Sequence, residues 1–206
     1  MGNLDSRSDA ELLKRSLAGE EGAFQLLYER LKTPLFRYAF YMTSSKTAAE
    51  EVIQEVFLFL FKNGNRYRES KGDVAGFVFG VTRNVVRRVQ RREKIHASLS
   101  SDEVIVNFPQ AAVSESEGLP TQAIRNQLVR RMEAAVTSLP DHYRQVVVLC
   151  DLCEFSYAQA AVRLGCAVGT IRSRLNRAHV LLAQKVKQST KTHPELSGTG
   201  TEECLT

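Results

Sequence analysis

The sequence predicts an all-α protein of two small helical domains joined by a flexible linker, the C-terminal domain containing a helix-turn-helix. Apolar residues recur at helical spacing over most of the chain, and no Asn-Gly or Asp-Gly hairpin signal lies between alternating strands. Residues 95–122 break this periodicity with serine, acidic residues and proline. We therefore expect domains over residues 5–94 and 123–188, a flexible acidic linker over 95–122 and a disordered tail over 189–206.

The first domain is expected to hold four helices, each bounded by a residue that starts or stops a helix. A short helix capped by Asp9 stops at Gly19, and Pro34 should kink or break the helix that follows. A very polar segment between two glycines, residues 64–72, is expected to be a loop. The other three helices are expected over about Glu20–Met42, Lys46–Lys62 and Asp73–Glu93.

The second domain is expected to be helical over about residues 121–187. Within it, Ser156 followed three residues later by Gln159 predicts a capping box, and Gly165 should end that short helix. A basic helix then begins at about Val168. A short capped helix, a glycine turn and a second basic helix together predict the helix-turn-helix.

The composition favours a folded protein without a membrane span. Of the 206 residues, 43% are hydrophobic, which is enough to bury a core. The longest apolar runs, residues 56–61 and 146–150, are far shorter than the roughly 18 residues that a membrane helix needs. No apolar stretch follows Met1. We therefore expect no membrane insertion, no secretory signal and a cytoplasmic location.

The charged residues lie in blocks along the chain. Residues 83–94 contain six bases and one acid, and residues 168–191 contain six bases and no acid. Between them, residues 98–122 contain four acids and no base. Two basic segments around an acidic spacer suggest two contacts on a nucleic acid, although two solvated helix faces give the same pattern.

The second helix of the predicted helix-turn-helix has a face suited to the major groove. Its apolar residues recur on one side and are expected to pack inward: Ile171, Leu175, Ala178 and Leu182. The opposite side presents Gly169, Arg172, Ser173, Asn176 and Arg177. Arginine pairs with guanine and asparagine with adenine in that groove. A solvated basic helix that binds no DNA is the alternative.

The helix predicted over residues 73–93 has features of single-stranded DNA binding. Opposite its valine stripe lie small, polar and basic residues: Gly76, Gly80, Arg83, Asn84, Arg87 and Arg91. Tyr67 and Phe77 add aromatic rings beside this basic surface, and Arg68 adds a further charge. Such rings stack on unpaired bases while arginines contact phosphates. Core packing of Phe77 and helix packing at the glycines are the alternatives.

The helix predicted over residues 46–62 is apolar around most of its circumference. One stripe is expected to be buried: Ala49, Val52, Ile53, Val56 and Leu60. Phe57, Leu58 and Phe61 extend the apolar surface, while Glu51, Gln54 and Glu55 form an acidic edge. The pattern favours equally the centre of a helix bundle and a docking face for a basic partner.

The reactive side chains do not form a recognisable catalytic set. No Ser/His/Asp combination, paired carboxylates or phosphate-binding loop is evident, so we expect no enzymatic activity, no cofactor and no metal site. The cysteines do not suggest a disulfide framework. Cys150 and Cys153 form a CxxC spacing with Cys166 nearby, so a redox or metal role for these thiols stays open.

Three segments together resemble extracytoplasmic-function (ECF) sigma factors, compact members of the bacterial sigma-70 superfamily. Residues 49–57 (AEEVIQEVF) are similar to the polymerase-binding motif of that family. The Tyr67-Arg68 loop, with Asn84 before a basic run, is similar to its promoter-melting domain. Residues 168–178 (VGTIRSRLNRA) match the domain that reads the upstream promoter element.

This resemblance covers about residues 8–188 and implies a function. It implies a factor that binds core RNA polymerase, directs it to promoter DNA, helps to open the duplex and is controlled by an anti-sigma factor. The residues implied to dock on the polymerase are Glu51, Gln54, Glu55 and Phe57. Those implied to engage the downstream promoter element are Tyr67, Arg68, Asn84, Arg87 and Arg88, with Asn84 reading an extruded base. Those implied to read the upstream element are Thr170, Arg172, Ser173, Asn176 and Arg177.

The resemblance allows a first mutational expectation and leaves two other functions to consider. We expect Glu55→Lys or Phe57→Ala to weaken polymerase binding while the fold stays largely intact. One alternative function is a stand-alone helix-turn-helix regulator, which binds DNA without polymerase. The other is a thiol- or metal-responsive sensor built on the three cysteines at positions 150, 153 and 166.

Overall fold

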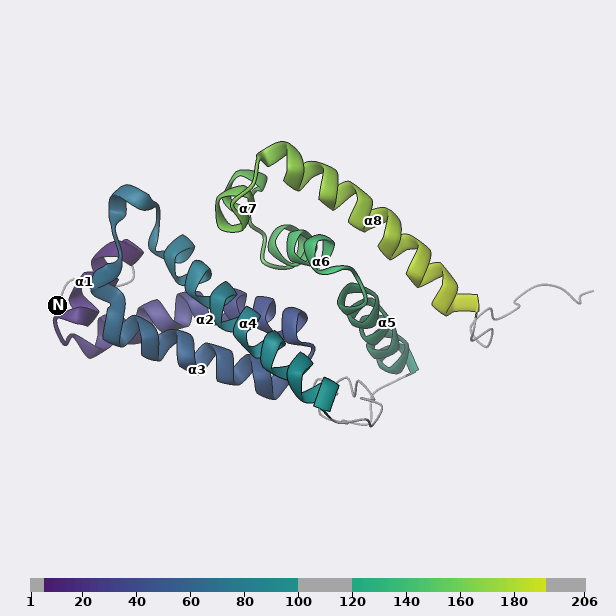
Figure 1. Ribbon diagram of the computed structural model, residues 1–206, viewed down its shortest axis with the longest axis horizontal. Helices are drawn as coiled ribbons and strands as arrows, with labels where there is room; N and C mark the ends of the chain where they lie inside the picture. Colours follow the sequence, from purple (N-terminus) through teal and green to yellow (C-terminus); the bar gives the residue numbers. More distant parts are fainter. Residues whose placement is uncertain (1–5, 100–119, 192–206) are drawn as a thin grey trace, which may run out of the picture.

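The computed structural model describes residues 6–99 and 120–191, and within these ranges every regular element is a helix (Figure 1). Two groups of helices are visible, one from each described range, and they pack against each other. The prediction of an all-α protein with two helical regions is therefore confirmed. The intervening segment 100–119 and the tail 192–206 lie outside the described residues.

The N-terminal group contains four α-helices and a connection of two short 3-10 turns. In chain order these elements are α1 (Asp9–Leu17), α2 (Glu21–Thr43), α3 (Lys46–Asn63), η2 (Gly64–Arg66), η3 (Glu69–Lys71) and α4 (Val74–Leu99). The predicted loop 64–72 thus consists mainly of the two 3-10 turns. Helix α2 packs against α1, α3 and α4. Its buried residues at helical spacing, Leu27, Leu31, Leu35 and Tyr38, form the centre of this group.

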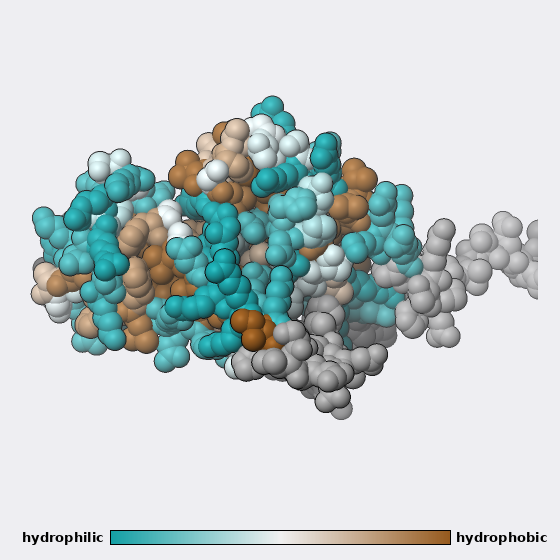
Figure 2. All heavy atoms as spheres, in the orientation of Figure 1, coloured by the Kyte–Doolittle hydropathy of each residue, from teal (hydrophilic) through white to brown (hydrophobic). Residues whose placement is uncertain are grey.

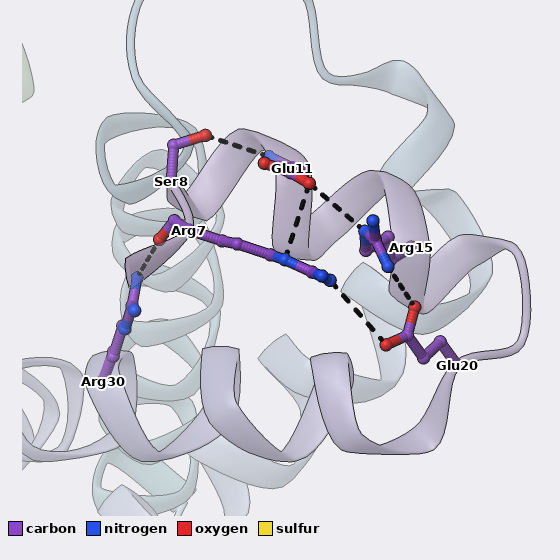
Figure 3. Close-up of polar contacts among 6 residues, drawn as sticks. All are labelled: Arg7, Ser8, Glu11, Arg15, Glu20 and Arg30. Atoms are coloured by element: carbon purple, nitrogen blue, oxygen red, sulfur yellow. Dashed lines mark hydrogen bonds and ion pairs between the residues drawn. The ribbon is translucent and has the colours of Figure 1, made fainter. Parts of the chain in front are cut away.

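The first helix is capped by Ser8, so the prediction that Asp9 caps it is wrong. The Ser8 hydroxyl accepts a hydrogen bond from the Glu11 N–H at 3.2 Å. The Asp9 carboxylate instead accepts a hydrogen bond from Arg30 of α2 at 2.9 Å. Figure 3 shows that Arg30 also donates to the Arg7 carbonyl, and that Arg15 pairs with both Glu11 and Glu20. These contacts fix α1 on the N-terminal part of α2.

Helix α2 runs through Pro34 without a break, so of the two predicted effects, a kink or a break, the break does not occur. Leu31 and Leu35 on either side of the proline are almost completely buried. Burial of large apolar side chains contributes about 1.5–3 kcal/mol each, which offsets the hydrogen bond that proline removes. Tertiary packing therefore keeps the helix continuous where local chemistry alone disfavours it.

Helix α4 and the predicted linker have different bounds from those expected. The helix continues to Leu99, beyond the predicted end at Glu93, and the next helix begins at Pro120. Proline at a first helical position loses no hydrogen bond, because the first N–H groups of a helix have no partner within it. The predicted linker over 95–122 is thus helical at both of its ends.

The C-terminal group contains four α-helices and one π-helical turn. In chain order these are α5 (Pro120–Thr137), α6 (Asp141–Val147), the π-helical turn η4 (Val148–Leu152), α7 (Tyr157–Leu164) and α8 (Val168–Lys191). Helix α8 packs against α5, α6 and α7. The core between them includes Leu139, Val146, Leu149, Ile171 and Leu175, all less than 5% exposed.

The predicted helix-turn-helix is present with the predicted caps. The Ser156 hydroxyl accepts a hydrogen bond from the Gln159 N–H, and the Gln159 side chain accepts one from the Ser156 N–H. The two bonds complete the capping box. Gly165 ends α7 in the left-handed conformation, with φ of +67°. Glycine adopts this conformation at no steric cost, which explains why the turn falls there.

Candidate polymerase and nucleic-acid interfaces

An apolar groove lies between α2 and α3. It has a volume of about 810 Å³, and aromatic rings from both helices form much of its lining, including Phe24, Tyr28, Phe36, Phe57 and Phe61. Phe61 is 64% exposed and Leu58 is 51% exposed at its rim, and we call this concavity the docking groove. Large apolar side chains exposed together in a concavity mark a binding surface for a partner.

The residues predicted for polymerase docking lie in different environments. Gln54 lines the docking groove, and Phe57 forms part of its floor. Phe57 is only 5% exposed, and its ring centroid lies 4.6 Å from that of Tyr28 and 6.1 Å from that of Phe24. This ring therefore belongs to the core, and we now expect Phe57→Ala to destabilise the fold, which replaces the expectation from sequence.

Glu51 and Glu55 face away from the docking groove, towards α4. Glu55 forms an ion pair with Arg88, and both carboxylate oxygens of Glu51 accept from Arg92, at 3.0 and 3.2 Å. Glu51 and Glu55 are four residues apart on α3, as are Arg88 and Arg92 on α4. The two pairs thus form a two-rung ladder between antiparallel helices, and the sequence pattern did not indicate it.

The exposed side of α4 matches its predicted polar face. Asn84, Arg87, Arg88 and Arg91 are all exposed, opposite the buried residues Val74, Val78, Val85 and Val89. In the view of Figure 2, hydrophilic residues follow this helix across the front of the molecule. Several guanidinium groups on one exposed helix face are suited to contacts with phosphates.

The loop before α4 places an aromatic pair beside this face. The ring centroids of Tyr67 and Phe77 lie 5.8 Å apart, and both side chains are partly exposed. Burial raises the pKa of the Tyr67 hydroxyl, and the carboxylates of Glu69 and Asp73 raise it further. Arg68 is exposed and donates to the backbone carbonyls of Asn65 and Tyr67. Tyr67 therefore stays protonated near neutral pH and can donate a hydrogen bond.

The two helical groups contact each other through the start of α4 and the segment before the helix-turn-helix. Phe79 meets Phe155 edge to face at a centroid distance of 5.5 Å. The Arg163 guanidinium lies 4.1 Å above the Phe155 ring and 3.7 Å from the Asp73 carboxylate. Burial lowers the pKa of Arg163, because the charged form has lost water. This contact orders the two groups in the described arrangement.

One residue of the predicted DNA-binding face takes part in this contact. The Arg83 guanidinium lies 3.4 Å from the carbonyl oxygens of Arg163 and Leu164 at the C-terminal end of α7. The end of a helix carries partial negative charge, which favours a cation there. Arg83 is therefore engaged within the protein, whereas Asn84 and Arg87 remain exposed.

The predicted DNA-reading face of α8 is exposed opposite a buried stripe. Ile171, Leu175, Ala178 and Leu182 are at most 8% exposed. Arg172, Ser173, Asn176 and Arg177 are exposed, and Thr170 is partly buried. Ser173 donates to the Thr170 carbonyl, and His179 contacts Asp151 of η4 at 2.7 Å. The structure thus brings the predicted upstream-element residues together on one surface.

Cys153 lies at the contact between the two groups. The Cys153 thiol donates to the Pro34 carbonyl of α2 at 3.5 Å. Burial raises the pKa of Cys150 and of Cys153 from 9.0 to about 11. The thiolate is the reactive form of cysteine, so burial opposes a redox role for this CxxC pair. Within the described ranges, no group of three or more His, Cys, Asp or Glu side chains is arranged to hold a metal ion.

Alkylation rates test this thiol chemistry. At pH 8 we expect Cys150 and Cys153 in the folded protein to react with iodoacetamide about 100-fold more slowly than in urea-unfolded protein, because their thiolate fraction is that much lower. Residue-resolved mass spectrometry measures both rates. Equal rates in the folded and unfolded protein would contradict the raised pKa and restore the thiol-sensor alternative.

Several residues of these surfaces were not in the predicted sets. Leu58 and Phe61, named from sequence only as an extension of the apolar surface, define the docking groove together with the rings on α2. Arg92 completes the ladder. From sequence, an exposed apolar residue can be suspected only where a helix has more apolar residues than one buried face needs. Which of these residues stay exposed depends on the helices that pack against the buried face.

No helix in the described ranges is long and apolar enough to cross a membrane.

The fold and these surfaces define a class of protein: an all-helical nucleic-acid-binding protein with a helix-turn-helix in one half and a basic, aromatic-edged helix in the other. Comparison with protein families agrees with this class. The family model Sigma-70 region 2 matches residues 27–95, and Sigma-70, region 4 matches residues 129–181.

Named relatives are ECF RNA polymerase sigma factors. EcfG of Rhodopseudomonas palustris (strain TIE-1) is 30% identical over 150 residues, which are 71% of this chain and 75% of the relative. SigM of Mycobacterium tuberculosis (strain H37Rv) is 29% identical over 183 residues, 89% of this chain and 87% of the relative. SigE of Mycolicibacterium smegmatis is 29% identical over 161 residues, 77% of this chain and 60% of the relative.

Two solved structures share the fold. CnrH, in complex with the cytosolic domain of CnrY, superposes with a TM-score of 0.65 at 20% identity, over 88% of this chain and 99% of that one. The sigma factor RpoE, in complex with the anti-sigma factor NepR from Bartonella quintana, gives 0.63 at 23% identity, over 80% and 96%. The chain belongs to the ECF sigma factors of the sigma-70 family, which are transcription initiation factors and not enzymes.

Proposed function

We propose that the chain docks on core RNA polymerase through the docking groove between α2 and α3 and presents two DNA-reading surfaces to a promoter. The main observation in support is the groove, which exposes Leu58 and Phe61 around a concave, aromatic surface. Exposed aromatic and aliphatic anchors that fill or line a pocket dominate the energy of many protein interfaces. Gln54 and Glu50 supply polar contacts at the rim of this surface.

Docking extends along α3 to the acidic edge of Glu51 and Glu55. These carboxylates are about half-exposed, so a basic surface of the polymerase can reach them. Opposite charges at an interface speed association and fix its orientation. Phe57 contributes to docking from below, because it holds the exposed rings of the groove in place.

The downstream promoter element is assigned to the loop before α4 and to the exposed face of that helix. The residues of this surface are Tyr67, Arg68, Asn84, Arg87 and Arg88. Asn84 can form two hydrogen bonds to the edge of an extruded base, and the neighbouring guanidinium groups can bind phosphates. The Tyr67–Phe77 pair offers rings on which unpaired bases stack.

The upstream element is assigned to the exposed face of α8. Its residues are Thr170, Arg172, Ser173, Asn176 and Arg177. They lie near the start of the second helix of a helix-turn-helix, where contacts with base edges are made in the major groove. The proposed domains, residues 5–94 and 123–188, separate the two reading surfaces along the chain.

Control by an anti-sigma factor completes the proposal. One structural neighbour was solved with the anti-sigma factor NepR. A protein that covers the docking groove would block access to polymerase without unfolding the factor. The proposed location is the cytoplasm, where polymerase and promoter DNA are found.

A competition experiment tests polymerase docking. We expect the variant L58A/F61A to bind core polymerase about 10- to 100-fold more weakly than wild type, because both anchors leave the interface. Labelled wild-type factor is displaced from core polymerase by increasing amounts of each variant. Val162→Ala, which truncates an apolar residue that is 73% exposed on α7, serves as the control.

Each outcome separates the candidate functions. Unchanged affinity of L58A/F61A, with wild type bound tightly, would contradict docking through this groove. Failure of wild type to bind polymerase, together with tight binding to promoter DNA alone, would favour the stand-alone regulator. Transcription by the reconstituted complex from a candidate promoter then tests promoter selection directly.

A further inference from the structure

The α3–α4 ladder joins the two surfaces to which different partners have been assigned. Its carboxylates, Glu51 and Glu55, belong to the acidic edge of the polymerase-docking helix. Its guanidinium groups, Arg88 and Arg92, belong to the basic promoter helix. In the free protein each set therefore neutralises the other.

The geometry places the ladder beside the base-reading position. Asn84, Arg88 and Arg92 are spaced four residues apart and so share one face of α4. The guanidinium groups held by the two glutamates are thus neighbours of the exposed Asn84 side chain. Phosphates of a strand bound at Asn84 would compete with the two carboxylates for the same donors.

Both rungs are weak enough to exchange. Arg88 and Arg92 are 63% and 54% exposed, and their carboxylate partners are 43% and 52% exposed. Ion pairs with this exposure contribute little to stability because water solvates both partners. A partner that brings a new opposite charge can replace either side of such a pair.

We infer that the ladder is a charge-exchange coupling between polymerase docking and promoter binding. Basic groups of the polymerase take the carboxylates of Glu51 and Glu55, which releases Arg88 and Arg92 for DNA phosphates. In the free factor these two charges are already paired, which lowers its affinity for DNA phosphates. The inference rests on the proposed docking of the acidic edge on polymerase.

The DNA side of the coupling is tested without polymerase. We expect E51Q/E55Q to bind a fluorescent 20-residue oligothymidine about 3- to 10-fold more tightly than wild type at low salt, measured by anisotropy. The slope of log affinity against log salt should steepen by about 1.4, since two more phosphates are contacted on a single strand. In an R88Q/R92Q background the same glutamate substitutions should change neither quantity.

A charge-matched variant controls for net charge. E29Q/D141N also removes two carboxylates, but these pair with basic residues of their own helices, Lys32 and Arg144. This control should leave the oligothymidine affinity close to that of wild type. If both double variants raise the affinity equally, long-range charge explains the effect and the ladder does not mask the arginines.

The polymerase side is tested without DNA. Coupling is reciprocal, so R88Q/R92Q should bind core polymerase about 3- to 10-fold more tightly than wild type in the competition assay, because its carboxylates are unpaired. R91Q/K94Q removes two exposed basic residues of the same helix that make no ion pair with α3 in the described part of the chain, and should not tighten binding. Equal affinities of R88Q/R92Q and wild type would overturn the exchange.

Failure of the inference is distinguishable from failure of the proposed function. If docking through the groove is wrong, L58A/F61A retains wild-type affinity for polymerase. If docking is right and the exchange is wrong, L58A/F61A loses affinity while the ladder variants leave both binding curves unchanged.

Discussion

Phe57→Ala is expected to lower the free energy of unfolding by about 3–5 kcal/mol, the usual cost of truncating a buried phenylalanine. The ring is 5% exposed and contacts the rings of Tyr28 and Phe24 across the α2–α3 interface. Such a loss corresponds to a decrease of more than about 10 °C in the melting temperature of a helical unit of this size. Differential scanning calorimetry measures it.

Phe61→Ala provides the matched comparison on the same helix. Its ring is 64% exposed, so its removal should change the melting temperature little while it weakens polymerase binding. The pair separates the stability of the groove from its function as a docking surface. An unchanged melting temperature for Phe57→Ala would mean that the floor of the groove does not depend on this ring.

Leu175→Ala is expected to destabilise the C-terminal helices by about 2–5 kcal/mol. Leu175 is 4% exposed, and it lies in the stripe of α8 that packs against α5, α6 and α7. The loss includes both the transfer of the leucine side chain and the cavity that remains. Thermal unfolding followed by circular dichroism measures it.

Arg177→Ala tests the opposite face of the same helix. Because the side chain is exposed, the melting temperature should stay close to that of wild type. Loss of an arginine that reads a base should reduce the free energy of DNA binding by about 1–3 kcal/mol at one promoter position. Loss of a phosphate contact would instead weaken binding to all sequences equally. Early melting of Arg177→Ala together with a stable Leu175→Ala would show that the two faces are assigned the wrong way round.

Much of the fold could be predicted because its signals are local. Period-3.6 apolar stripes located the helices, and the stripe of α8 is buried as predicted. The Ser156–Gln159 capping box and Gly165 fixed the bounds of α7, since hydroxyl caps and left-handed glycines act within one turn. The two helical regions followed from the break in periodicity between them.

Errors arose where a local signal met a competing contact. Ser8 and Asp9 are both good capping residues, but Ser8 caps the helix while the Asp9 carboxylate pairs with Arg30 of α2. Pro34 disfavours a helix locally, but the buried leucines around it hold α2 continuous. Helix α4 likewise extends beyond its predicted end.

The candidate surfaces divide in the same way. Residues on one helix face, such as Arg172 and Arg177, could be grouped from spacing alone, because the geometry of a helix fixes which residues share a face. Phe57 and Phe61 could not be distinguished in this way. Both are aromatic residues of one helix, and only the packing of α2 against α3 buries the first and exposes the second.

The sequence by itself determined the helices, the helix-turn-helix and the likeness to ECF sigma factors, since these depend on periodicity, caps and motifs within short segments. Only the tertiary structure decided that Glu51 and Glu55 pair with Arg92 and Arg88. It also decided that Arg83 binds the end of α7. These pairings join residues more than thirty positions apart, and their partners depend on the packing of whole helices, which no short segment encodes.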